Sequence, residues 1–293
     1  MGVRQRPRAD LGMKIVAVIQ ARTGSSRLPG KILLKALGQP LLALMLERVR
    51  AARQLDEVVV ATTSLTADDA IRELARRLDV ACVSGHPLDL LDRHLQAAQA
   101  AEADAVVKIP SDCPLIDPRV IDEVVGVYQR DADRYDFVSN LHPATWPDGN
   151  DVEVVSRGVL EEAHREAQRG YEREHTTPFV WDRPERYRLG NVTWRPGRDL
   201  SASHRLTLDY PEDFQLIARV FEALYQREQP APFSVDDIVS YLDAHPDVGA
   251  LNAAYRGSGW IDRHRHELRT TQRREPGTAA TSTRPSPTEV VPS

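Results

Sequence analysis

Short apolar runs alternate with amphipathic segments through the first half of the chain. The runs are rich in Val, Ile and Ala, which is typical of strands buried inside a sheet. Between the runs, apolar residues recur at helical spacing, and Asp68 is expected to cap the second helix. Strands that alternate with helices predict an α/β fold with a mixed, mostly parallel sheet and flanking helices. The predicted core strands are Ile15–Ile19, Glu57–Thr62, Val80–Ser84 and Ala105–Ile109, and the predicted helices are Leu41–Arg53, Asp68–Leu78 and Asp89–Ala100.

The rhythm changes near Asp136, after which the predicted strands become shorter. We expect an antiparallel excursion from the sheet over about residues 136–200, which serves either ligand recognition or a contact between two copies of the chain. Residues 1–12 are polar and basic, and residues 266–293 are rich in Thr, Ser, Pro and Arg without periodicity, so both are predicted to be flexible tails. Residues 13–265 are then one domain. Its later elements are predicted strands at Phe137–Ser139, Asp151–Val155 and Tyr187–Val192 and a short helix at Asp236–Leu242.

The stretch from Ala17 to Lys31 leads from the first predicted strand into a loop that carries three cations. Arg22, Arg27 and Lys31 stand among small residues. Glycine and serine let the main chain approach a phosphate closely, and fixed cations neutralise the phosphate charge. Open α/β sheets bind ligands at the carboxyl ends of their strands, where this loop lies. The stretch therefore predicts a polyphosphate site rather than an ordinary basic surface turn.

The spacing of this loop excludes two common phosphate motifs. A Walker A motif has a glycine separated by four residues from Gly-Lys and a hydroxyl residue directly after it, but Ser25 and Ile32 occupy those positions. The dinucleotide fingerprint G-x-G-x-x-G is absent from the sequence. The loop must therefore belong to another class of phosphate site.

The motif A-R-x-G-S-x-R-L-P-G-K resembles the nucleotide-binding signature of the cytidylyltransferases. These include the acylneuraminate and 3-deoxy-manno-octulosonate CMP-sugar synthetases, and the resemblance is greater to the spore-coat polysaccharide branch. It spans about residues 14–255 and implies a Rossmann-like sheet of the nucleotide-diphospho-sugar transferase type. It also implies that the loop wraps the triphosphate of CTP, with Arg22 and Lys31 as catalytic phosphate contacts. The other loop residues expected at the nucleotide are Ala21, Gly24, Ser25 and Arg27.

Two carboxylates follow predicted strands and are candidates for a metal site. Asp112 comes after the strand that ends at Ile109, and Asp209 follows the alternating run from Arg205 to Leu208, which we interpret as a strand. Mg²⁺ uses few protein ligands beside substrate phosphates, although an Asp before Pro also suits a plain turn. The resemblance implies that Asp112 and Asp209 bind Mg²⁺.

Three side chains near these carboxylates have other interpretations. Lys108 either reaches the phosphates or only buries its aliphatic stem. Glu212 and Asp213 stand in the first turn of a predicted helix, where acidic residues complement the helix dipole. These two acidic residues are therefore expected to be structural rather than metal ligands.

Two further segments resemble motifs of the spore-coat branch, P-D-G-x-D-V-E-V and E-R-E-H-x-T-P. They hold more polar groups than a turn or a helix start requires, and we interpret them as the acceptor side. His175 is alternatively a helix cap or a core histidine, and Asn150 departs from the apolar residue expected there. The acceptor candidates are Asp151, Glu153, Arg173, Glu174 and His175.

Base recognition is expected after the second and third strands, where small residues and backbone groups suit a pyrimidine edge. Ordinary strand-end turns contain the same residue types. Asp89 and Arg93 on the next helix are either ribose or base contacts or part of a solvated helix face. The base-side candidates are Thr62, Thr63, Ser84 and Gly85.

Composition narrows the remaining classes of function. The chain has 293 residues, 41% hydrophobic and 28% charged, and its net charge of −5 argues against broad nucleic-acid binding. No apolar run approaches the roughly 20 residues of a membrane span, and no signal peptide is evident, so we expect a cytoplasmic protein. Cys82 and Cys113 lack zinc spacing and are interpreted as small buried residues.

Together with these residues, the resemblance to the cytidylyltransferases implies a Mg²⁺-dependent enzyme that transfers CMP from CTP to a small acceptor and releases pyrophosphate. The acceptor is expected to be a sugar acid, a sugar phosphate or a phosphonate. Relatives commonly form homodimers, and neither nucleic acid nor membrane is an expected partner. The alternatives are a guanylyl- or uridylyltransferase of the same fold and a nucleotide-binding protein without turnover.

Overall fold

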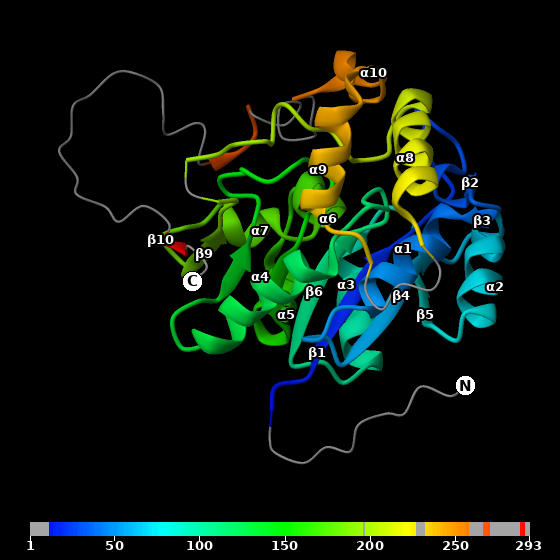
Figure 1. Ribbon diagram of the computed structural model, residues 1–293. Coiled ribbons are helices and arrows are strands. Elements are labelled where there is room, and N and C mark those ends of the chain that lie inside the picture. The colour runs from blue at the N-terminus through cyan, green and yellow to red at the C-terminus, as the bar shows by residue number, and fades with distance from the viewer. Residues whose placement is uncertain (1–11, 196, 227–231, 258–265, 270–287, 291–293) are drawn as a thin grey trace.

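The computed structural model describes residues 12–195, 197–226, 232–257, 266–269 and 288–290 (Figure 1). Most of the two predicted tails lies outside these residues. Within the predicted C-terminal tail, however, Leu268 is buried against the protein, and residues 288–290 form a strand.

One sheet organises the described residues, with strands in the order β10-β9-β7-β8-β6-β1-β4-β5. Only β8 in this sheet runs against its neighbours, because all other pairings are parallel. The predicted mixed, mostly parallel sheet is therefore confirmed. The strands are β1 Ile15–Gln20, β4 Glu57–Thr63, β5 Ala81–Gly85, β6 Ala105–Pro110, β7 Phe137–Ser139, β8 Glu153–Ser156, β9 Leu189–Val192 and β10 Thr288–Val290, and a separate hairpin joins β2 Lys35–Ala36 to β3 Gln39–Pro40.

Helices cover both faces of the sheet and produce two apolar layers. Alternate residues of β1 enter opposite layers: Ile15 and Ile19 pack with α1, α4 and α8, whereas Val16 and Val18 pack with α3 and α5. Figure 1 shows α8, α9 and α10 gathered together in yellow and orange. The helices are α1 Leu41–Arg50, α2 Asp69–Arg77, α3 Leu90–Ala100, α4 Pro118–Arg130, α5 Arg157–Glu166, α6 Gly170–His175, α7 Pro178–Trp181, α8 Pro211–Leu224, α9 Val235–Ala244 and α10 Pro246–Gly249, with 3-10 turns at Lys31–Leu33, Thr66–Asp68 and Ala253–Tyr255.

Three sequence-based expectations are wrong in detail. The strand expected at Val80–Ser84 is β5, which lies at the edge of the sheet and, among the described residues, pairs only with β4. Its residues are consequently largely exposed. Cys82 is consequently exposed rather than buried, whereas the burial of Cys113 is confirmed. The run from Arg205 to Leu208 is not a strand of the sheet, since only Arg205 forms an isolated bridge, to Asp148.

Candidate active site

The loop after β1 is anchored by Asp68. The Asp68 carboxylate accepts hydrogen bonds from the backbone N–H of Thr23 (2.7 Å) and from the hydroxyls of Thr23 (2.6 Å) and Thr63. Asp68 precedes α2 as expected, but its side chain does not cap that helix, because Thr23 and Thr63 occupy it. Burial raises the pKa of Asp68, but these hydrogen bonds outweigh burial and leave the pKa below its ordinary value.

The loop closes at Gly30 and delivers Lys31 into the site. Gly30 has φ of 67°, and its N–H donates to the carbonyl of Thr23 at 2.9 Å. The Lys31 ammonium donates to Leu208 O (2.6 Å), Asp209 Oδ1 (2.9 Å) and Asp112 Oδ2 (3.3 Å). Burial lowers the pKa of Lys31, but the two carboxylates outweigh it and raise the pKa above its ordinary value. The structure thus brings three predicted site residues from distant segments into contact.

The other two loop cations point in different directions. Arg27 Nη2 lies 2.6 Å from Asp209 Oδ1, so this guanidinium joins the same carboxylate as Lys31. Arg22 is exposed and donates from Nη1 to the carbonyl of Pro87, at 3.5 Å, in the segment after β5. Ala21 extends the pairing of β1 with β4 by one residue, because its N–H donates to the carbonyl of Ala61 at 3.0 Å. Gly24 is exposed and Ser25 is half-buried.

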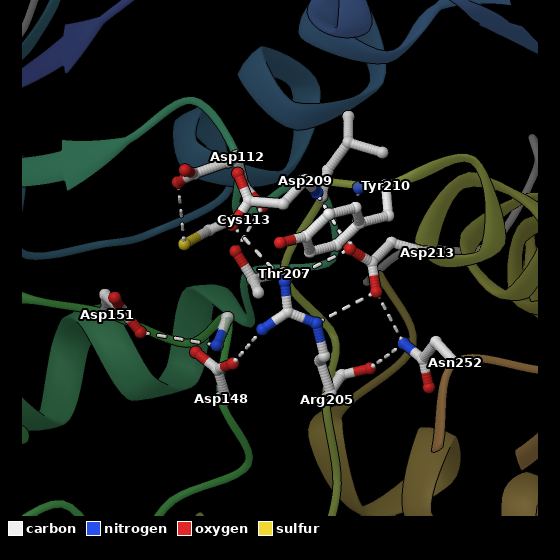
Figure 2. A network of polar contacts seen from close by, with 12 residues as sticks. Asp112, Cys113, Asp148, Asp151, Arg205, Thr207, Asp209, Tyr210, Asp213 and Asn252 are labelled. Atoms are coloured by element: carbon white, nitrogen blue, oxygen red, sulfur yellow. Dashed lines mark hydrogen bonds and ion pairs between the residues drawn. The ribbon is translucent and has the colours of Figure 1, made fainter. Parts of the chain in front are cut away.

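A buried arginine holds the carboxylate that follows the extended run. Arg205 pairs with Asp209 Oδ2 (3.2 Å), with Asp148 Oδ2 (3.2 Å) and with Asp213 (3.0 and 3.1 Å) (Figure 2). Burial raises the pKa of Asp209, but Lys31 and Arg27 outweigh it and hold the pKa below its ordinary value. Asp209 is therefore a carboxylate kept in its charged form.

Gly149 brings two more carboxylates to this region. Its φ is +103°, and a Cβ there would lie 2.6 Å from the main chain of Leu206 and Thr207, so only glycine permits this approach. Asp148 and Asp151 flank the contact. Burial and repulsion from Asp151 raise the pKa of Asp148. Burial and repulsion from Asp112 likewise raise the pKa of Asp151.

The buried side chain of Arg93, in the first turn of α3, packs against one of the base-side candidates. Gly85 lies against it, because a Cβ at Gly85 would be 2.8 Å from Arg93 Cγ. Among the described residues, Arg93 Nε and Nη2 and the Thr62 hydroxyl have no hydrogen-bond partner. Thr63 serves the loop anchor instead, and Ser84 is exposed.

The acceptor-side candidates fall into two groups. Glu153 is buried, pairs with Lys108 and accepts a hydrogen bond from the Thr177 hydroxyl at 2.7 Å. Burial raises the pKa of Glu153, but Lys108 and His142 together outweigh burial and bring the pKa to about 2. Lys108 thus has a third role beside the two expected from sequence, as the partner of Glu153.

The second group lies on α6, which packs against α3. Arg173 Nε donates to Asp89 Oδ2 at 2.6 Å and Nη1 to the carbonyl of His164 at 3.0 Å, so other parts of the chain already engage its guanidinium. Glu174 is exposed, and His175 is the last residue of α6 and half-buried.

The donor set fits a hard divalent cation. Asp112 and Asp209 each have an oxygen within 3.3 Å of the Lys31 ammonium, so this side-chain cation bridges the two carboxylates. In the described part of the chain, no three His, Cys, Asp or Glu side chains form a complete metal cage. Two carboxylates completed by phosphate oxygens and water are the usual environment of Mg²⁺.

In the described residues, no helix has the length and apolar character needed to cross a bilayer.

The model of the cytidylyltransferase family matches residues 16–238, which include the loop, both carboxylates and the sheet apart from β10 and the first residue of β1. The chain belongs to the cytidylyltransferase family. It is an enzyme of the CTP-using nucleotidyltransferases, as the resemblance implied, and the cytidylyl reaction is favoured over the guanylyl and uridylyl alternatives.

Relatives agree with this membership of the cytidylyltransferase family. A cytidylyltransferase structure from Leptospira borgpetersenii serovar Hardjo-bovis is 33% identical with a TM-score of 0.74, over 80% of this chain and 96% of that chain. Spore coat polysaccharide biosynthesis protein SpsF of Bacillus subtilis is 28% identical over 82% of this chain and 98% of its own length. A 3-deoxy-manno-octulosonate cytidylyltransferase of Geobacter metallireducens is 36% identical over 41% of this chain and 46% of its own.

The sequence analysis of this cytidylyltransferase did not identify three residues of the site: Arg205, Asp213 and Asn252. Asp213 was expected only to complement a helix dipole, yet it is fully buried and binds Arg205. No local signal marks Arg205, because it stands at a polar position of the alternating run, where an arginine is ordinarily exposed. Nothing local to Asn252 indicates its role.

Proposed function

We propose that this cytidylyltransferase transfers CMP from CTP to an oxygen of a small acceptor, in a Mg²⁺-dependent reaction that releases pyrophosphate. The observation that carries the proposal is the contact of Lys31 with both Asp112 and Asp209. A phosphate-type loop and two hard oxygen ligands then face one point at the carboxyl ends of the parallel strands.

The proposed roles follow from the charge of each group. Asp112 and Asp209 hold Mg²⁺, which when bound would offset the negative charge of the triphosphate and of the attacking oxygen. Lys31 and Arg27 donate to phosphate oxygens that leave as pyrophosphate, and Arg22 approaches the triphosphate from the β5 side. The protein performs little covalent chemistry, because positioning and charge stabilisation supply most of the acceleration in such transfers.

The base pocket is proposed between the ends of β4 and β5 and the start of α3. A buried donor without a partner costs about 1–3 kcal/mol, so Arg93 Nε and Nη2 favour a ligand that supplies acceptors. The carbonyl and ring nitrogen of cytosine are such acceptors. Gly85 lies against Arg93, and Thr62 and Ser84 are proposed to complete the pocket from the ends of β4 and β5, whereas Thr63 contributes through the loop anchor.

The acceptor is proposed to be a sugar acid, a sugar phosphate or a phosphonate. Support comes from the relatives, one named for spore-coat polysaccharide biosynthesis and one for octulosonate transfer. Asp151 is the first of the proposed acceptor contacts, since its carboxyl group interacts electrostatically with Asp112 of the proposed metal site. Glu153, Arg173, Glu174 and His175 are proposed to form the remainder of that side.

Pyrophosphate release tests this proposal directly. The purified protein is incubated with CTP, UTP, GTP or ATP, with and without Mg²⁺, and with a panel of sugar acids, sugar phosphates and phosphonates. We expect release only with CTP, Mg²⁺ and one acceptor class, and loss of release in Asp112→Asn and Asp209→Asn. A preference for UTP or GTP contradicts the base assignment, and CTP binding without turnover across the panel indicates a nucleotide-binding protein.

A further inference from the structure

Arg205 lies at the centre of the carboxylates around the proposed reaction point. Its side chain is 2% exposed, and its three nitrogens face Asp148, Asp209 and Asp213 (Figure 2). A planar guanidinium presents donors in a fixed fork, so it can hold several carboxylates at set angles. The Arg205 side chain is thus enclosed by protein rather than aimed at solvent.

Asp213 binds the side chain of Arg205, and Asn252 binds its backbone carbonyl. Asp213 is fully buried and accepts hydrogen bonds from two nitrogens of Arg205 and from the backbone N–H groups of Asp209 and Tyr210, both at 2.9 Å. The Asn252 amide donates to Asp213 Oδ1 (2.8 Å) and to the carbonyl of Arg205 (2.9 Å). Main chain and side chain of the 205–210 segment are therefore fixed by one buried network.

This network gives the two oxygens of Asp209 different partners. Oδ2 accepts from Arg205, whereas Oδ1 accepts from Lys31 and Arg27 of the nucleotide loop. A carboxylate free to rotate about its last bond would exchange these oxygens. Held at Oδ2, Asp209 keeps Oδ1 turned toward the loop.

We propose that Arg205 is a positioning residue, which fixes the carboxylates of Asp209 and Asp148 so that Asp209 Oδ1 faces the metal and the triphosphate. The inference rests on the proposed metal role of Asp209. Arg205 acts through these carboxylates and does not contact substrate. Groups that orient metal ligands commonly change metal affinity or activity by about 10–100-fold when they are replaced.

The test is Arg205→Lys, with Arg48→Lys as the matched control. Lysine keeps the charge but cannot span three carboxylates from one nitrogen. Arg48 is likewise buried, and its guanidinium donates to the carbonyls of Ile116 and Phe233. The same exchange at Arg48 therefore reproduces the loss of a buried fork that holds main-chain carbonyls rather than the proposed metal ligands.

Mn²⁺ binding, followed by electron paramagnetic resonance, and steady-state kinetics are measured on the full chain. For Arg205→Lys we expect about tenfold weaker Mn²⁺ binding and about a hundredfold lower kcat, with the KM for CTP within about threefold. For Arg48→Lys we expect Mn²⁺ affinity and kcat within about twofold of wild type. Its loss of thermal stability should be comparable to that of Arg205→Lys. A folded Arg205→Lys protein with wild-type Mn²⁺ affinity overturns the inference.

Asp213→Asn provides a second variant should Arg205→Lys fail to fold. It removes the charge that holds Arg205, and we expect Mn²⁺ affinity and kcat to fall in the same direction; unchanged values overturn the inference as well. Asp112→Asn and Asp209→Asn separate the two levels of the proposal. If neither weakens Mn²⁺ binding, the metal assignment fails and the positioning role falls with it. If both weaken binding and Arg205→Lys does not, the positioning role alone fails.

Discussion

At the scale of single residues, Lys31 combines two properties that rarely occur together. It is mostly buried, yet it remains charged because two carboxylates and a carbonyl surround its ammonium. Asp209 would keep two other cations, Arg27 and Arg205, if Lys31 were lost. The need for Lys31 is therefore expected to be greater in the transfer step than in folding.

The substitution Lys31→Met separates these contributions. We expect kcat for pyrophosphate release to fall about 10²–10³-fold, as for the loss of a group that stabilises developing charge. The free energy of unfolding in urea should fall by only about 1 kcal/mol, since Asp209 keeps its other partners. Lys35→Met, at an exposed lysine of β2, is the matched control and should leave kcat unchanged. Turnover near the wild-type rate in Lys31→Met would remove this residue from the reaction.

At the scale of elements, the sequence predicts the strands that follow from apolar periodicity. It misses the side-chain roles that depend on partners from distant segments of the chain. The buried strands β1, β4 and β6 follow from continuous apolar runs, and the sheet confirms them. β5 has similar composition, but it lies at an edge, which its own residues do not reveal. The roles of Asp68 and Arg205 depend on partners from other segments, so a local cap and a local strand were the natural but wrong interpretations.

The anchor between the β1 loop and the start of α2 gives a prediction at this scale. Asp68→Ala removes the acceptor of three hydrogen bonds and leaves the Thr23 N–H without that partner. We expect the KM for CTP to rise severalfold and the free energy of unfolding at pH 7 to fall by about 1–3 kcal/mol. Enzyme kinetics and urea unfolding measure the two effects.

The pH dependence of this difference has a definite sign. Because the pKa of Asp68 is lowered in the folded protein, its contribution is present above the unfolded pKa of about 4 and is lost as the pH falls further. The stability gap between wild type and Asp68→Ala should therefore narrow below about pH 4. A gap that stays constant down to pH 2 would show that the charged carboxylate does not stabilise the loop.

At the scale of the whole molecule, β8 divides the sheet into two parts. On one side β6, β1, β4 and β5 lead their carboxyl ends to the nucleotide loop and to Asp112, and on the other side lie β7, β9 and β10. Lys108 of β6 and Glu153 of β8 are direct partners across this boundary, and both are buried. Their ion pair therefore joins the two parts of the sheet beneath the proposed acceptor side, where Glu153 has been proposed to contact the acceptor.

A single and a double variant separate the structural from the acceptor role of Glu153. Lys108→Met leaves a buried carboxylate without its cation, so we expect the free energy of unfolding to fall by about 3–5 kcal/mol. Lys108→Met with Glu153→Met replaces the pair by apolar groups of similar length and should recover most of that loss, because the desolvation of both charges is also removed. The recovered protein is then assayed for pyrophosphate release at varied acceptor. An acceptor KM raised about tenfold or more, at an unchanged KM for CTP, supports direct contact of Glu153 with the acceptor. An unchanged acceptor KM limits Glu153 to joining β6 and β8, and acceptor recognition is then to be sought at Asp151.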